Sequence, residues 1–570
     1  MIPAPAVWSD RRRFTRFPRC GRALQPVNVS QVCREVWSAI LLSTPGEGTP
    51  LRSVEIVLGL VVLATVVAAS AKRLRAPAPS LLVLAGLLVG LLPGVPPVRV
   101  PPDIVSLVVL PPLVYAAGEE MSWQVLRQVW RPVVLLAVGL VVASAAAVGL
   151  VTVAVTGLPW SLAFLLGTVL ASTDPVAVAA LGRRLSLPPK LQTLVQAESL
   201  FNDATSLLLY RVAVAIAVAG GSVSWAWAAG DFLLLAGGGV VAGAVVAAGI
   251  ATIRRRTEDP VLETVIALIT PYAAYVLAEA VHASGVTSVV VAAVIMGRQA
   301  PALTNAGIRL QLTAVWGTVV FLLESVVFSL IGLELPTLIR ELSRTGEPWL
   351  LPAVLVAATL IVVRIAWVFP LSGLQQWRGG SRPSWQVPAV VSWAGARGVV
   401  PLAATLAIPL TTDAGLPLAG RELLVVLATA VIVISLVVQG FTLAPLVRRA
   451  GVAVEPADSR QEYVRARLKT AQAALARLEE LERAEAAPEV VLERLRVGLL
   501  DRLERAELRA TGDGAIGPVT DAYRDMRRDL IAAETAELHH LHDTGEIGES
   551  TRRTIQRLLD LEETALNEQA

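Results

Sequence analysis

A polar stretch, residues 197–210 (AESLFNDATSLLLY), lies inside a long apolar run of the sequence. At helical spacing Ser199 and Asp203 are four residues apart and share one face, and Glu198 and Asn202 share the adjoining face. Carboxylate, hydroxyl and amide oxygens are hard ligands that suit a small cation. The stretch therefore predicts a cation-binding face on one helix.

A second polar patch, residues 170–178 (LASTDPVAV), precedes it in another apolar run. Pro175 disfavours helix in the residue before it and has no N–H to donate, so we expect the helix to break near Thr173 and Asp174. It should restart at Pro175, a favoured first helical position. Two compatible roles stay open for Asp174: an ion ligand, or the N-cap of the half-helix that follows it.

The composition indicates a membrane protein. The chain has 570 residues, 54% hydrophobic and only 17% charged, with a mean hydropathy of +0.63. Soluble domains average about 25% charged residues. A charge at the bilayer centre costs about 2.5–3.5 kcal/mol, so such groups usually face the protein interior or line an ion path. The net charge of +3 is too small to indicate a nucleic-acid partner.

The sequence predicts an all-α polytopic membrane protein with about thirteen transmembrane helices. Its apolar segments lie near residues 53–71, 79–95, 103–117, 131–155, 159–181, 193–217, 229–252, 260–282, 285–297, 313–337, 349–372, 385–410 and 420–446. Thirteen spans allow two inverted six-helix repeats around a linking seventh, which makes span five the counterpart of span twelve. Span twelve carries a second helix-interrupting cluster, residues 395–401 (GARGVVP), so we expect two broken helices.

Three regions follow from these patterns. We expect residues 1–51 to form a disordered polar tail, or to reflect a wrongly chosen start codon. Residues 52–449 form the transmembrane domain, and residues 450–570 form a soluble helical tail that breaks at 511–514. Basic clusters fall in alternate loops, which places the C-terminus in the cytoplasm by the positive-inside rule.

Asp203 is the residue on which we expect the chemistry to centre. Burial penalises the charged form of a carboxylate, so a desolvated aspartate can be protonated near neutral pH. Such a group holds either a proton or a sodium ion, and that mutual exclusion is ion exchange. The structural alternative is an aspartate bonded only to backbone or arginine; the convergence of Ser199 and Asn202 with it favours ion binding.

These motifs resemble a known family. Ser-Thr-Asp-Pro-Val at 172–176, Glu-Ser-Leu-Phe-Asn-Asp at 198–203 and Trp-Ala-Gly-Ala-Arg-Gly at 393–398 are similar to sodium/proton antiporters of the NhaP/NHE type, monovalent cation:proton antiporter family 1. The resemblance covers about residues 52–449. It implies exchange of sodium for protons across the plasma membrane for pH and sodium homeostasis, with no cofactor and with a homodimeric assembly.

The resemblance also implies residue roles. It places Thr173 and Asp174 in the sodium site beside Asp203 and Ser199. The pairing of Asn202 with Asp203 implies electroneutral exchange.

Three further charges take structural roles by the same resemblance. Glu198 is implied to pair with Arg364, whose unpaired burial would be implausible, and Arg397 is implied to neutralise helix ends. In one departure, residues 110–115 (LPPLVY) are followed by alanines 116 and 117, where many relatives carry an acidic residue. Lithium or potassium therefore stays open in place of sodium.

Other functions are less well supported. A channel needs a continuous polar lining, whereas the intramembrane polar residues here cluster in two or three spans. A membrane-embedded sensor that signals through its tail would lose function when the residues after about 455 are removed. No nucleophile elbow, phosphate loop or zinc motif indicates an enzyme.

Overall fold

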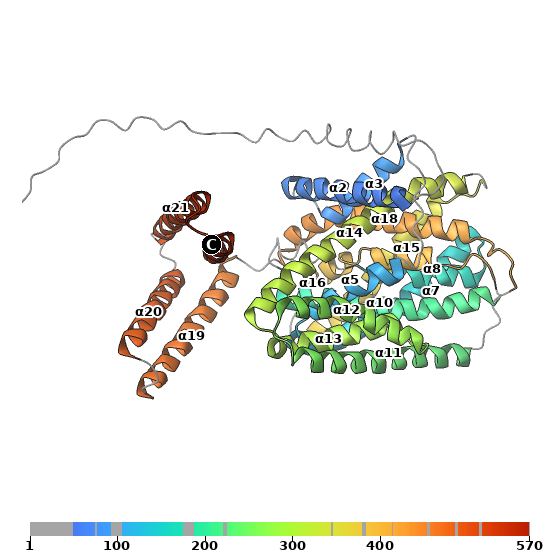
Figure 1. Cartoon of the computed structure of the whole chain (residues 1–570). Helices are drawn as coiled ribbons and strands as arrows, with labels where there is room; N and C mark the ends of the chain where they lie inside the picture. Colours follow the sequence, from blue (N-terminus) through green and yellow to red (C-terminus); the bar gives the residue numbers. More distant parts are fainter. Residues whose placement is uncertain are drawn as a thin grey trace, which may run out of the picture. The chain divides into compact units, whose positions relative to one another are not determined.

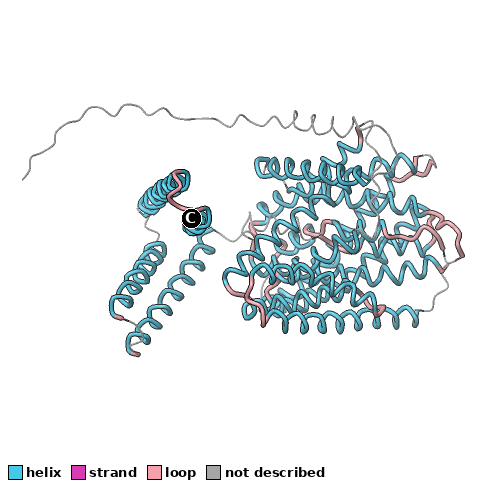
Figure 2. The backbone as a smooth tube through the Cα atoms, in the orientation of Figure 1, coloured by secondary structure: helices cyan, strands magenta, loops and turns pink. Residues whose placement is uncertain are grey.

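The computed structural model describes residues 50–74, 77–92, 105–174, 187–219, 225–343, 346–378, 384–412, 414–452, 456–484, 488–511 and 516–568. Within these ranges the chain is helical, and one isolated β-bridge joins Thr411 to Pro417 (Figure 2). The predicted all-α class is confirmed. The predicted tail over residues 1–51 lies outside the described residues, apart from its last two.

The described chain forms two compact units that divide at residues 453/454. The first unit, the membrane unit, has the following helices, most of which are labelled in Figure 1: α2 Pro50–Leu74, α3 Ala78–Gly90, η1 Val105–Val109, α5 Leu110–Glu119, α6 Trp123–Val134, η2 Leu135–Leu140, α7 Val141–Thr156, α8 Trp160–Leu170, α10 Pro189–Val218, α11 Trp225–Arg254, α12 Pro260–Ala280, α13 Gly285–Leu303, α14 Ala306–Leu342, α15 Leu350–Arg378, α16 Gln386–Trp393, α17 Val399–Leu406 and α18 Arg421–Ala450.

Each of the predicted apolar segments overlaps one or more of these helices. Among the described residues, 8 helical stretches are long and apolar enough to cross a membrane, and four apolar helices are shorter. The exact number of spans stays a prediction. Local signals set several helix ends: Asp259 accepts hydrogen bonds from the N–H groups of Val261 and Leu262 at 2.8 and 2.9 Å, and so caps α12.

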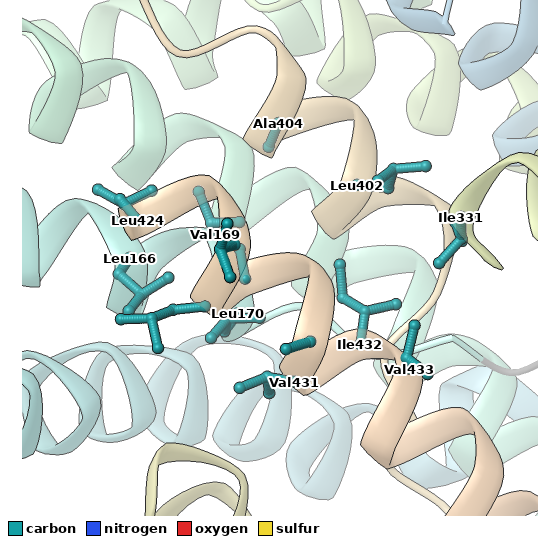
Figure 3. Close-up of a cluster of buried hydrophobic side chains, with 14 of the residues drawn as sticks. Leu166, Val169, Leu170, Ile331, Leu402, Ala404, Leu424, Val431, Ile432 and Val433 are labelled. Carbon is teal, nitrogen blue, oxygen red and sulfur yellow. The ribbon is translucent and has the colours of Figure 1, made fainter. Parts of the chain in front are cut away.

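Helix packing divides the membrane unit into two bundles. The site bundle contains α6, η2, α7, α8, α10 and α15–α18, and the flanking bundle contains α2, α3, η1, α5 and α11–α14. The largest apolar core joins them. Figure 3 shows Leu166 and Leu170 of α8 beside Val431 of α18, with Ile331 of α14 reaching the same cluster from the flanking bundle.

Two segments of the site bundle are unwound. α8 ends at Leu170, and residues 171–174 are not helical. α16 ends at Trp393, and the chain stays unwound until α17 begins at Val399. Both breaks fall where the sequence predicts them. The predicted restart at Pro175 lies outside the described residues, and the inverted repeat stays a prediction.

The second unit, residues 454–570, is a pair of helical hairpins built from α19 Pro456–Arg483, α20 Glu489–Thr511, α21 Ile516–Asp543 and α22 Glu549–Glu568. Buried apolar residues recur every seven positions, as in Val464, Ala471 and Leu478 of α19, which is the spacing of coiled-coil contacts. The sequence predicts a helical tail with a break at 511–514, and the structure describes two helices on each side of that break. Pro488 accounts for one division, because proline cannot continue a helix from the preceding turn.

Candidate ion-binding site

The two unwound segments of the site bundle contact each other at Asp174. The Asp174 N–H donates to the carbonyl of Ala396 at 2.7 Å, and the Val399 N–H donates to Asp174 Oδ2 at 3.3 Å. The carboxylate therefore sits at the N-terminus of α17, where the helix dipole favours negative charge. A Cβ on Gly398 would lie only 1.6 Å from Asp174 Oδ2, so glycine is what permits this approach.

Asp174 thus caps α17, a helix that begins more than 200 residues later in the sequence. The alternative prediction, that it caps its own half-helix from Pro175, falls on residues outside the described ranges.

Side chains of α10 hold the first unwound segment through Thr173. Asn202 Nδ2 donates to Thr173 Oγ1 at 2.6 Å, and the Thr173 N–H lies 3.4 Å from Asn202 Oδ1. Ser199 Oγ donates to the Thr173 carbonyl. Backbone groups that a helix would normally satisfy are therefore bonded by side chains of a neighbouring helix, which is what buried backbone requires.

Asp203 lies beside this contact. Its Oδ1 accepts a hydrogen bond from Ser172 Oγ, one residue before Thr173. Asp203 is 7% exposed and Asp174 8%, so both carboxylates are removed from bulk water. The structure brings together all five residues predicted for the site: Asp203, Asp174, Thr173, Ser199 and Asn202. Sequence reasoning did not single out Ser172, although its hydroxyl stands in the same unwound segment.

Glu198 and Arg364 form a buried ion pair between α10 and α15. The guanidinium contacts both carboxylate oxygens, and its Nε and Nη2 also donate to the Val391 carbonyl at 3.1 and 3.0 Å. The two residues are 1% and 2% exposed. Gly395 leaves the space for this guanidinium, because a Cβ there would lie 2.5 Å from Arg364 Nε. The pair ties the helix that carries Asp203 to the end of α16.

Arg397 occupies the second unwound segment and is buried. Its N–H donates to Ser435 Oγ at 3.0 Å, and its guanidinium donates to the Gly395 carbonyl at 3.1 Å. Carbonyls just after a helix carry partial negative charge, so a cation near the end of α16 is favourable. The role of Arg397 in neutralising a helix end stays a prediction.

Buried carboxylates where two unwound segments meet are typical of secondary transporters of small cations. A family profile described as "Sodium/hydrogen exchanger, transmembrane" matches residues 60–449. The chain is 33% identical over 535 residues to an uncharacterized Na+/H+ exchanger of Mycobacterium tuberculosis strain H37Rv, which covers 90% of this chain and 97% of that one. The Na+/H+ antiporter ApNhaP of Aphanothece halophytica is 30% identical over 364 residues, which cover 64% of this chain and 68% of that protein.

The fold is similar to that of a solved antiporter. The sodium proton antiporter MjNhaP1 of Methanocaldococcus jannaschii superposes with a TM-score of 0.57 at 20% identity, covering 70% of this chain and 99% of that chain. The chain belongs to the sodium/hydrogen exchanger family, and it is a multi-pass membrane protein that acts as a monovalent cation:proton antiporter.

Proposed function

We propose that the protein exchanges sodium for protons one-for-one, with Asp203 as the group that binds either ion. The observation that carries this proposal is the contact of two buried carboxylates with an unwound, hydrogen-bonded segment. Asp203 accepts from Ser172, and Asp174 caps α17 beside it. Among the described residues Asp203 forms no ion pair with an arginine or lysine, so a mobile cation or proton is left to neutralise it.

The proposed cation ligands are oxygens of Asp203, Asp174, Thr173 and Ser199. Ser199 donates its only hydroxyl hydrogen to the Thr173 carbonyl, so the lone pairs of the hydroxyl oxygen are available to bind a cation. Asn202 holds Thr173 at its hydroxyl and its N–H, so we assign it the role of positioning that residue. Protonation of Asp203 removes the charge that attracts sodium, and the two ions therefore compete.

Charge balance supports the one-to-one stoichiometry. Around the crossing, the described residues supply the carboxylates of Asp174, Asp203 and Glu198 and the guanidiniums of Arg364 and Arg397. Three negative and two positive charges leave one net negative charge. One sodium ion or one proton neutralises it, and a low-dielectric interior strongly disfavours any other loading.

We also propose the cellular setting that the resemblance and the loop charges indicate. The protein would lie in the plasma membrane as a homodimer and serve pH and sodium homeostasis. Its transmembrane exchange domain would span residues 52–449, and the helical tail from residue 450 would be cytoplasmic. Alternating access would move the site bundle against the flanking bundle.

The test uses everted membrane vesicles with an acid interior, whose pH gradient is followed by fluorescence. Addition of sodium should collapse the gradient with the wild type and not with Asp203→Asn, while Asp231→Asn on α11 should behave as the wild type. Lithium and potassium additions establish the selectivity. A gradient that no cation collapses, with folded protein in the membrane, would overturn the proposal.

Stoichiometry needs its own measurement. One-for-one exchange moves no net charge, so the initial rate should not change when a membrane potential is imposed with a potassium gradient and valinomycin. Sodium must be the transported cation in this assay, because the potassium gradient sets the membrane potential. A rate that rises steeply with the potential would exclude electroneutral exchange.

A further inference from the structure

The ion pairs of the membrane unit differ in what they connect. Among the described residues, Glu198 and Arg364 lie within the site bundle, and Arg254 pairs with Glu263 within the flanking bundle. The pair between Arg211 of α10 and Glu279 of α12 instead links the two bundles. The sequence gives no partner for Arg211, and the structure supplies one from the opposite bundle.

Arg211 stands on the helix that carries the ion site. It follows Asp203 by eight residues, which is about 12 Å along the axis of α10. Glu279 lies in the last turn of α12. The positive-inside orientation places the Arg254–Arg256 loop in the cytoplasm, so the Arg211–Glu279 pair lies on the opposite, outer side of the site.

Glu279 is fixed to the flanking bundle. Its Oε1 also accepts from the N–H of Gly285, the first residue of α13, at 3.1 Å. A Cβ on Gly285 would lie 2.9 Å from that oxygen and 2.7 Å from the Tyr275 ring, so the turn is built closely around the carboxylate. The preceding residue, Ser284, donates its N–H to the Leu235 carbonyl of α11 at 3.1 Å.

We propose that Arg211 and Glu279 form an outer latch between the two bundles, which is closed here and opens once in each transport cycle. This inference rests on the proposed function, because alternating access requires one bundle to move against the other. A pair anchored on both cannot survive that movement unchanged. Its side chains are 35% and 34% exposed, so the pair is not locked into the protein interior and can break repeatedly.

The test is a reversible cross-link in the full chain. Cys20 and Cys33 are the two native cysteines, and both are first replaced by serine. In that background R211C/E279C is treated with a flexible bifunctional methanethiosulfonate reagent in membrane vesicles. Sodium-driven exchange should fall at least tenfold when the link forms and should recover on reduction. The single variants R211C and E279C, treated alike, control for modification at each position.

Two outcomes separate the latch from the underlying function. If the reduced variant exchanges sodium for protons and the cross-linked variant does so equally fast, the bundles do not move at this point and the latch is excluded. If neither the wild type nor the reduced variant exchanges any cation, the proposed function has failed first.

A charge reversal covers the case in which the cysteine variant does not fold. Arg211→Glu faces Glu279 with a like charge and should slow exchange several-fold. R211E/E279R restores the attraction and should recover most of the rate. A double variant no faster than the single variant, with both folded, would also count against the latch.

Discussion

Charged side chains are held in opposite ways in the membrane unit and in the C-terminal tail. At the ion site, Glu198 and Arg364 are buried, and their contacts include a backbone carbonyl in addition to each other. In the tail, Arg496 contacts Glu482 and Glu493 while all three side chains remain in water. The ion-pair distances are similar in the two regions, but only the charges at the ion site have exchanged their hydration for protein contacts.

This difference decides what the loss of one partner does. Removal of one member of a buried pair leaves an uncompensated charge in a low-dielectric environment. Removal of one member of an exposed pair returns the other to water, at little cost. We therefore expect the effect of each substitution described below to depend more on the burial of the charged group than on its ion-pair distance.

Glu198→Gln should have the largest effect on stability, because it leaves the buried Arg364 guanidinium without a charged partner. Breaking a pair of this kind costs about 3–5 kcal/mol of folding free energy. Thermal unfolding in detergent should show a large fall in melting temperature, with Glu493→Gln in the tail as the exposed control. Equal melting temperatures for the wild type and Glu198→Gln would contradict the view that burial makes this ion pair important for stability.

Gly398→Ala should mainly harm transport. Its new Cβ would lie 1.6 Å from Asp174 Oδ2, so the carboxylate or the unwound segment has to move. A displacement of about 1 Å in a preorganised site can cost on the order of 100-fold in rate. We expect at least a tenfold loss of sodium-driven exchange in the vesicle assay.

The matched control for this glycine is Gly237→Ala, on α11, where a Cβ meets nothing within 4 Å. It should exchange as the wild type does. If both alanine variants transport equally well, the close approach of Gly398 to Asp174 does not shape the site.

The smallest effect belongs to the tail. Hydrogen bonds from Arg552 and then Arg553 lower the pKa of Glu549 from 4.5 to about 2. A lowered pKa means that the carboxylate favours the folded start of α22 above pH 4.5, and that this contribution is lost as the pH falls from 4.5 toward 2. Because the group is exposed, the change should be slight.

Hydrogen exchange at the first turn of α22, measured in the full chain between pH 5 and pH 2.5, can detect this change. Protection should weaken slightly in the wild type as the pH falls. The pH-dependent part should be absent in Glu549→Gln. Identical pH profiles for the two proteins would show that the arginines do not stabilise this turn through Glu549.

The sequence by itself determined the helical class, the positions of the apolar segments and both helix breaks. These features depend on signals that act within a few residues: hydrophobic content, the proline at 175 and the glycines at 395 and 398. It also determined that Ser199 and Asp203 share a face of α10, because helical periodicity alone places residues four apart together. The number of helices in each half of the tail was not predicted, although Pro488 is a local signal for one helix boundary.

Only the tertiary structure decided which distant groups meet. Asp174 contacts Ala396 and Val399 across more than 200 positions of the sequence, and Arg211 finds Glu279 in the other bundle. No local pattern encodes such partners, because they depend on how whole helices pack and on where a glycine lets a charged group approach. The sequence supplied the groups that could bind an ion, and packing brought them to one buried place.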